Sequence, residues 1–544
     1  MPSTSKKSAV IGLGLLGLIS GSAALAAQTT PMPKLLHEQG RYELQVDGKP
    51  YLILGAQVNN SSNWPATLDE IWPAATDIHA NTLLVPMAWE QIEPTEGKFD
   101  FGYLDTLVQQ ARAHNVRLGL LWFATWKNNN PNYAPSWVKL DNQRFPRVVD
   151  NKGDVLNSLS PVGNNTLKAD RTAFVALMTH LKQIDGQRHT VIMVQVENEA
   201  GTFGTDRDYS PAADRLFKQA VPDTLLKAMH KPAGSWDQVF GEHAAEYFHA
   251  WSIAHYINQV AAAGKAVYDL PMYANAMLRP PLGAARPGFD YSSGGPTYNV
   301  LGIWKAAAPA LDMLTPDIYM RGYQKYTTVL DQYQRPDNPL FVSETGNDKP
   351  YARYIFAALG KQAIGYSPFG IDFTPYSNWP LGARKMDPES LAPFAMNYEL
   401  LQPMASRIAA LSFEGKVWGA SEPTDTHEQT LDLGAWRVRI SYGLPEFGNE
   451  EFGHFIPKGN PEPDGGVLIA ELGPNKYLVT GYHARVEFLP AVGQHKHLIL
   501  DRVEQGRYEN GEWKFLRLWN GDQTDWGLNF VGAPEVLHVT LATY

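Results

Sequence analysis

The stretch Val194-Gln195-Val196-Glu197-Asn198-Glu199 is a short apolar run that ends in carboxylates, and Phe341-Val342-Ser343-Glu344 has the same design. Similar apolar runs alternate with helical patterns between about residues 50 and 373. They lie at 51–58, 82–87, 116–123, 191–196, 270–275, 313–319, 340–344 and 365–373. Eight successive β/α units predict an α/β fold, a (β/α)8 TIM barrel in which Glu199 closes the fourth strand and Glu344 the seventh.

A different pattern begins near residue 412. Short alternating segments, separated by turns rich in Gly, Pro, Asn and Asp, lie at 430–441, 466–472, 476–482, 486–489, 498–505, 512–518 and 536–541. This spacing is typical of an antiparallel β-sandwich. We therefore expect a catalytic barrel at residues 28–411 and a β-sandwich domain at 412–544. The sandwich is expected to brace the barrel, and the alternative is a carbohydrate-binding module.

The first 27 residues have the order of a secretory signal peptide. Lys6 and Lys7 precede an apolar run at 9–20, and small residues follow at 21–27. This order predicts cleavage near Ala26 or Ala27, a periplasmic or secreted protein, and no membrane span once the signal is removed. The chain contains no cysteine, which excludes disulfides and thiolate metal sites.

Composition narrows the classes of partner. The net charge is −10 and no run of Lys and Arg follows the first residues, so we expect no nucleic-acid partner. The histidines lack the H-E-x-x-H spacing of a zinc site, and we expect no metal. The 15 Trp and 25 Tyr residues fit either a large core or the flat apolar faces that bind sugars.

Two carboxylates at one rim of a barrel are the arrangement that glycosidic bond cleavage requires. The acid must keep its proton near neutral pH, so burial or a neighbouring carboxylate must raise its pKa. Glu199, at the rim, is the better candidate for this acid. Glu197 has the same strand parity as Glu199, so it is expected one layer deeper in the barrel mouth, paired with Arg or Tyr.

Other strand ends supply candidates for substrate binding. Asn198 could donate to a sugar hydroxyl or to the nucleophile. Tyr319 ends the sixth strand, where it could donate to Glu344 and keep it ionised. Trp122 and Trp126 end the third strand, where they could stack on a sugar or fill core. The remaining candidates at the barrel mouth are Asn59, Trp89, Glu90, Asn275 and Trp379.

Three motifs together resemble a known family. The segment 195–199, Q-V-E-N-E, resembles the acid/base motif of glycoside hydrolase family 35, the β-galactosidases of the clan A barrels. The segments 85–90 and 93–101 are similar to the second-strand signature of that family, and Ser343-Glu344 to its nucleophile motif. The resemblance covers about residues 40 to 400. It implies a retaining mechanism with Glu199 as acid/base and Glu344 as nucleophile, without a metal or organic cofactor.

The resemblance also implies a substrate. It suggests an exo-β-galactosidase that releases terminal β-D-galactosyl residues from oligo- or polysaccharides. The β-sandwich resembles the extra domain of a bacterial branch, whose members in plant-cell-wall-degrading bacteria act on galactosylated xyloglucan side chains. One motif departs from the family. After its third strand the family typically has Cys-Ala-Glu-Trp, whose Glu helps to hold galactose hydroxyls. The matching stretch here is Phe123-Ala124-Thr125-Trp126, so this Glu is absent. The alternatives are another retaining β-glycosidase, such as a β-glucosidase or endo-β-glycanase, and a non-catalytic sugar-binding protein.

Overall fold

The computed structural model describes residues 30–425, 428–443, 459–494, 497–525, 527–530 and 532–544. The expected signal peptide at residues 1–27 lies outside this part of the chain. Within the described ranges, no helix combines the length and the apolar character that crossing a membrane requires.

Eight parallel strands close a barrel, in which each strand lies beside its neighbour in chain order. The strands are β4 (Ile53–Gln57), β5 (Thr82–Ala88), β6 (Arg117–Lys127), β9 (Val191–Asn198), β10 (Met272–Met277), β11 (Met313–Ile318), β12 (Val342–Thr345) and β13 (Gly365–Pro368). Each overlaps one of the apolar runs identified in the sequence. The predicted TIM barrel is therefore confirmed.

Helices cover the outside of the barrel because their apolar residues recur at helical spacing. In α1 (Leu68–Asp77), the buried residues include Leu68, Ile71, Trp72 and Ala75, which form one face. The other covering helices include α3 (Gly102–Ala113), α5 (Asn164–Asp185), α9 (Ala244–Val267), α10 (Leu301–Ala307), α11 (Tyr323–Tyr333), α13 (Tyr354–Gly360), α14 (Pro388–Leu401) and α15 (Ala405–Phe413). Short elements in the loops include α2 (Trp89–Ile92), β7 (Arg147–Val149) and β8 (Val155–Leu159).

The barrel interior has its own apolar cluster near the strand starts. It contains Ile53, Leu84, Leu121, Phe123, Tyr273, Met313 and Phe341. An N-terminal three-stranded sheet, which the sequence analysis did not predict, adds Leu44 and Val46 to this cluster. Its strands are β1 (Lys34–Glu38), β2 (Arg41–Val46) and β3 (Lys49–Pro50). The sheet thus covers the end of the barrel opposite to the carboxyl ends of the strands.

Strand β6 changes its register near its carboxyl end. Trp122 pairs with Val196 of β9, whereas Lys127 pairs with Asn198. Five steps along β6 therefore match two steps along β9, as in an extended β-bulge. Beyond Trp122 the alternation of side chains between the two faces of the strand is interrupted.

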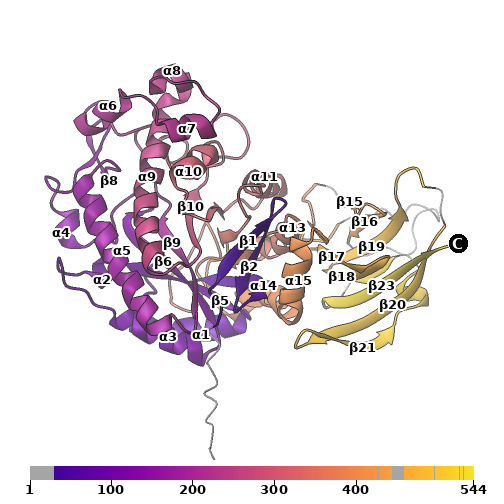
Figure 1. Cartoon of the computed structure of the whole chain (residues 1–544). Coiled ribbons are helices and arrows are strands. Elements are labelled where there is room, and N and C mark those ends of the chain that lie inside the picture. Colours follow the sequence, from indigo (N-terminus) through magenta and orange to yellow (C-terminus); the bar gives the residue numbers. More distant parts are fainter. Residues whose placement is uncertain (1–29, 426–427, 444–458, 495–496, 526, 531) are drawn as a thin grey trace, which may run out of the picture.

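The C-terminal region contains two antiparallel sheets (Figure 1). The larger has the order β14 (Val417–Ser421), β17 (Gly466–Gly473), β18 (Lys476–Tyr482), β23 (Glu535–Thr543), β20 (Leu498–Glu509) and β21 (Glu512–Leu518). The smaller has the order β15 (Glu428–Asp432), β16 (Trp436–Tyr442), β19 (Ala484–Pro490) and β22 (Leu528–Phe530). Apolar residues of both sheets, such as Val438, Val467 and Val479, share one core. The predicted antiparallel sandwich is confirmed, although the expected strand at 430–441 is a hairpin that turns at Gly434 with φ 81°.

The sandwich packs directly on the barrel along α13 and β14. A Cβ atom placed on Gly360 would lie 2.4 Å from the carbonyl oxygen of Gly419, so the two backbones touch. Ser421 donates a hydrogen bond to the carbonyl of Arg353 at 2.6 Å. Leu468 of β17 belongs to the same apolar cluster as the helices around the barrel. The two parts of the chain therefore share a continuous core.

Candidate active site

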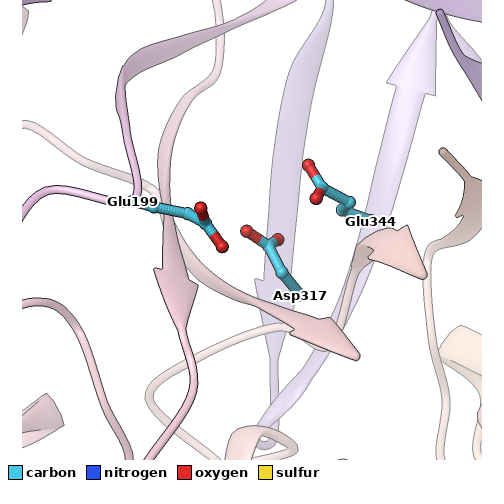
Figure 2. Close-up of side chains that lie close together, drawn as sticks. All are labelled: Glu199, Asp317 and Glu344. Atoms are coloured by element: carbon cyan, nitrogen blue, oxygen red, sulfur yellow. The ribbon is translucent and has the colours of Figure 1, made fainter. Parts of the chain in front are cut away.

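Three carboxylates meet at the carboxyl ends of the barrel strands (Figure 2). Glu199 directly follows β9, Asp317 lies on β11 and Glu344 on β12. One oxygen of each carboxylate lies within 4.8 Å of the others, and all three residues are buried. Figure 2 shows the carboxyl group of Asp317 between the other two. The structure thus brings together the expected pair, Glu199 and Glu344, and adds a third group that the sequence analysis missed.

Glu344 accepts hydrogen bonds on both of its carboxylate oxygens. Nε2 of Gln57 donates to Oε2 at 2.7 Å, and the hydroxyl of Tyr319 donates to Oε1 at 2.5 Å. Burial, followed by the charge of Glu344, raises the pKa of Tyr319 well above its usual range, so the phenol keeps its proton. These two donors fix the orientation of the Glu344 carboxyl group. The Tyr319 contact is the one expected from the sequence, and Gln57 is an addition.

Glu199 is held by its backbone. Its N–H donates to Oδ1 of Asn275 at 2.9 Å, and its carbonyl accepts from Nδ2 of Asn129 at 2.9 Å. Its φ of 45° lies in the left-handed region, which a non-glycine residue rarely adopts. Burial, and then the negative charge of Glu344, raise the pKa of Glu199 to about 7. Glu199 can therefore hold a proton near neutral pH.

Asp317 is linked to Glu199 through Asn275. Nδ2 of Asn275 donates to Oδ2 of Asp317 at 2.7 Å, while its Oδ1 accepts the Glu199 N–H. Burial is the main cause that raises the pKa of Asp317 well above its usual range, and the charges of Glu344 and Glu199 add to it. Lys127, a buried cation at the end of β6, opposes these shifts.

Asn198 precedes Glu199 and lies fully buried at the end of β9. Among the described residues, neither its amide nitrogen nor its amide oxygen has a hydrogen-bond partner. Buried polar groups almost always have partners in folded proteins.

Trp122 and Trp126 do not face the barrel mouth, so the proposed stacking on a sugar is wrong for both. Both are fully buried. Nε1 of Trp122 donates to Asp170 of α5 at 2.9 Å, and the ring of Trp126 packs edge-on against Tyr256 of α9. Trp122 follows Leu120 on the outer face of β6, which packs against the helices. The second use expected for them, filling core, is the one that the structure shows.

The second-strand candidates also lie away from the carboxylates. Trp89 is fully buried, and its Nε1 donates to Glu93 at 2.9 Å, so it is a core residue and not a sugar-binding surface. Glu90 is partly exposed and pairs with Lys139 at 2.8 Å. Both residues are displaced because β5 ends in the short helix α2, which turns Trp89 inward against Trp137.

Asn59 and Trp379 lie in the loops after the first and last barrel strands. The backbone N–H and side chain of Asn59 donate to Asp372 at 2.8 and 2.9 Å, so Asn59 connects these two loops. The side chain of Trp379 is 51% exposed, and the guanidinium of Arg384 lies 3.8 Å from its ring centroid. Trp379 is thus an open aromatic surface on the rim.

Glu197 does not lie in the barrel mouth as its strand parity predicted. It accepts from the N–H of Trp126 at 2.7 Å, and the charged group that acts on it is Asp170 of α5, outside the barrel wall. Its positive φ of 64° and the bulge in β6 break the alternation on which the prediction relied. Burial, and then the charge of Asp170, raise the pKa of Glu197 well above its usual range. Thr125 also donates to Asp170, at 2.7 Å, and points away from the mouth.

Comparisons with known proteins agree with this architecture. Residues 64–252 match a glycoside hydrolase 42 family model described as Beta-galactosidase, and residues 394–531 match a domain of unknown function, DUF5597. A β-galactosidase of Xanthomonas manihotis is 24% identical over 247 residues, which cover 38% of this chain and 39% of that protein. The matched region thus spans about two fifths of the relative.

Solved structures resemble the chain more widely. The β-galactosidase of Bacillus circulans sp. alkalophilus has a TM-score of 0.50 at 11% identity, and the match covers 90% of this chain and 99% of that one. The β-galactosidase of the psychrophilic Marinomonas ef1 has a TM-score of 0.48 at 13% identity and covers 66% and 61%. The first of these supports the fold. By sequence, the chain is similar to β-galactosidases over residues 64–252, and the matching model is of the 42 type instead of the family 35 type.

Proposed function

We propose that this protein is a retaining exo-β-galactosidase, which releases terminal β-galactosyl residues from oligo- or polysaccharides. The carboxylate pair carries the proposal, since Glu199 and Glu344 have oxygens within 4.8 Å of each other. Retaining glycosidases hold their carboxyl groups about 5–5.5 Å apart, whereas inverting enzymes need about 6.5–9.5 Å to admit a water. The short separation favours a double displacement. The family model matched at residues 64–252 supports galactose as the sugar.

Each residue then has a defined role. The carboxylate of Glu344 attacks the anomeric carbon while the bond to the leaving oxygen breaks, and Glu199 gives its proton to that oxygen. In the second step Glu199 takes a proton from water, the water oxygen bonds to the anomeric carbon, and Glu344 is released. The donors Gln57 and Tyr319 orient the Glu344 carboxyl group for attack. The buried amide of Asn198 is available to a hydroxyl of the bound sugar.

A groove beside the catalytic centre supports an oligo- or polysaccharide substrate. It has a volume of about 810 Å³ and lies between the loop after β11 and the start of the C-terminal region. Tyr319 lines this groove and also donates to Glu344, so one residue is shared by the groove and the catalytic centre. Its polar lining residues, which suit the hydroxyls of an aglycone, include Arg321, Gln324, Thr424, Asp425 and Gln429. Galactosylated xyloglucan is the substrate that we propose to test, in a protein that acts in the periplasm or outside the cell.

The decisive experiment replaces the nucleophile. Glu344→Gln should lower kcat on nitrophenyl β-D-galactoside on the order of 10³-fold or more, because the covalent step is lost. Glu512→Gln, an exposed residue of β21 paired with Lys514, is the matched control and should keep wild-type activity. Near wild-type activity of Glu344→Gln would refute the assignment.

Two further measurements test the retaining mechanism and the specificity for galactose. Proton NMR of the reaction should show β-galactose as the first product, and α-galactose would contradict retention. A panel of nitrophenyl β-glycosides separates a galactosidase from a glucosidase or another glycosidase. Binding of galactose without hydrolysis of any member of the panel would indicate a sugar-binding protein.

A further inference from the structure

The third carboxyl group, Asp317, has no part in the two-carboxylate mechanism. It is 3% exposed and lies opposite Glu344 in the register of β11 and β12. Its Oδ2 accepts from Asn275, whereas its Oδ1 is buried without a donor among the described residues. One oxygen of Asp317 nonetheless lies within 4.8 Å of an oxygen of Glu199. Two ionised carboxylates this close together in a buried site repel each other, and a proton on one of them turns it into a donor to the other.

The charges around Asp317 decide how many protons the cluster holds. The carboxyl groups of Glu199 and Glu344 face it from the ends of β9 and β12, and Lys127 of β6 is the cation that acts on it. The phenols near Asp317 and Glu344 belong to Tyr273, Tyr319 and Tyr333, and all three are buried strongly enough to stay neutral. Three ionised carboxylates beside one ammonium would leave two net negative charges in a buried site.

Glu344 must carry one negative charge, which Gln57 and Tyr319 already stabilise. Like charges a few ångströms apart in a buried site cannot all ionise near neutral pH. Glu199 and Asp317 are therefore the carboxyl groups that bind protons. Glu199 must exchange its proton in each turnover, but nothing in the chemistry requires Asp317 to release one.

We propose that Asp317 is a positioning residue that stays protonated throughout turnover and donates a hydrogen bond to the carboxyl group of Glu199. The inference rests on the proposed function and adds a residue to it. When Glu199 gives its proton to the leaving oxygen, the proton of Asp317 stabilises the new carboxylate. When Glu199 regains a proton from water, Asp317 still holds its own. Asn275 fixes this geometry, since it binds both Asp317 and the backbone of Glu199.

Two substitutions separate a protonated Asp317 from an ionised one. Asp317→Asn is neutral, can donate through its amide to Glu199 and can still accept from Asn275. It therefore imitates a protonated carboxyl group but not a carboxylate. Asp317→Ala removes the donor altogether.

The test is the dependence of kcat/KM on pH, measured with nitrophenyl β-D-galactoside. We expect Asp317→Asn to keep kcat/KM within about tenfold and to leave the alkaline limb of the profile in place. We expect Asp317→Ala to lower kcat by about 10- to 100-fold, which corresponds to a hydrogen bond to a charged group, and to move the alkaline limb upward, because the ionised form of Glu199 loses its donor. Asp312→Asn, directly before the start of the same strand, is the matched control and should keep the wild-type profile.

Two outcomes would overturn the proposal. A downward shift of the alkaline limb by a pH unit or more in Asp317→Asn would mean that a negative charge had been removed, and hence that Asp317 is ionised. A wild-type profile in Asp317→Ala would mean that the residue has no positioning role. Thermal unfolding of each variant verifies that it is folded.

An infrared difference spectrum keeps this inference separable from the proposed function. At pH 7, the spectrum of the wild type minus that of Asp317→Asn should contain the band of a protonated carboxyl group. A carboxylate band in its place contradicts the proposal. This result stands even if the wild type hydrolyses no galactoside, an outcome that would contradict the proposed function alone.

Discussion

Glu199 illustrates how a residue suited to catalysis lowers the stability of the fold. Burial and the charge of Glu344 raise its pKa from the ordinary 4.5 to about 7. Between these values the folded protein keeps a proton that the unfolded chain releases. The stabilising contribution of this proton is fully present below about pH 4.5 and is lost as the pH rises through about 7. The loss amounts to about 3 kcal/mol at 1.36 kcal/mol per pH unit.

Replacing this residue by its neutral amide should therefore stabilise the protein in alkaline solution. For Glu199→Gln we expect the free energy of unfolding to exceed that of the wild type by up to about 3 kcal/mol at pH 8.5. The difference should nearly vanish at pH 4.5. Urea unfolding at both pH values measures it, with Glu512→Gln as the control that should show no difference. An equal gain at both pH values would show that packing, and not ionisation, is the cause.

The sequence identified Glu199 and Glu344 because a strand that ends in a carboxylate is a local signal. Asp317 and Gln57 fall inside the apolar runs expected at 313–319 and 51–58, and no local pattern separates them from ordinary polar residues. One clue was available for Asp317, which lies two residues before Tyr319 and hence on the same face of the sixth strand. Its importance depends on contacts with distant strands, which a single sequence does not reveal.

At the scale of elements, the third barrel strand explains the wrong predictions for Trp126 and Glu197. Periodicity located β6 correctly, but its bulge has no Gly or Pro between Trp122 and Lys127 to mark it. The orientations predicted for Trp126 and Glu197 are wrong because they assume that side chains keep alternating between the two faces of the strand, which the bulge in β6 and the positive φ of Glu197 interrupt. The N-terminal sheet did carry a signal, since Asp47-Gly48 is a typical hairpin turn and both residues have positive φ.

The contact between α13 and β14 leaves no room for a side chain. For Gly360→Ala we expect a loss of about 1–3 kcal/mol in the free energy of unfolding, because the new Cβ would meet the backbone of Gly419 at 2.4 Å. Gly473→Ala is the control, since nothing lies within 4 Å of its Cβ position. Denaturant unfolding of both variants measures the difference. Equal free energies of unfolding for the two variants would mean that the backbone at this contact shifts to make room for the Cβ atom without loss of stability.

At the scale of the whole molecule, the substrate contacts extend beyond the catalytic centre. Arg321, which lines the groove, donates to the carbonyl of Pro380 at 2.9 Å, and Pro380 follows the exposed Trp379. The open ring of Trp379 and the groove therefore lie along one side of the barrel mouth. This arrangement suits a glycan that is longer than the galactose to be removed.

Removing that ring should affect large substrates more than small ones. For Trp379→Ala we expect KM for a galactosylated oligosaccharide to rise about threefold to tenfold, roughly 1 kcal/mol of lost aromatic contact. KM for nitrophenyl β-D-galactoside should change less. Phe515→Ala, an exposed aromatic residue of β21, is the control. An equal change for both substrates would place Trp379 at the galactose itself.

The continuous apolar cluster between the barrel helices and the six-stranded sheet has a consequence for engineering. A scanning calorimeter should record a single cooperative transition for the full chain, because neither part can melt without exposing the other. A barrel expressed alone would expose the apolar residues of this interface to water and would aggregate. A domain grafted from another enzyme would need to reproduce the close backbone contact at Gly360 before its own binding specificity could matter.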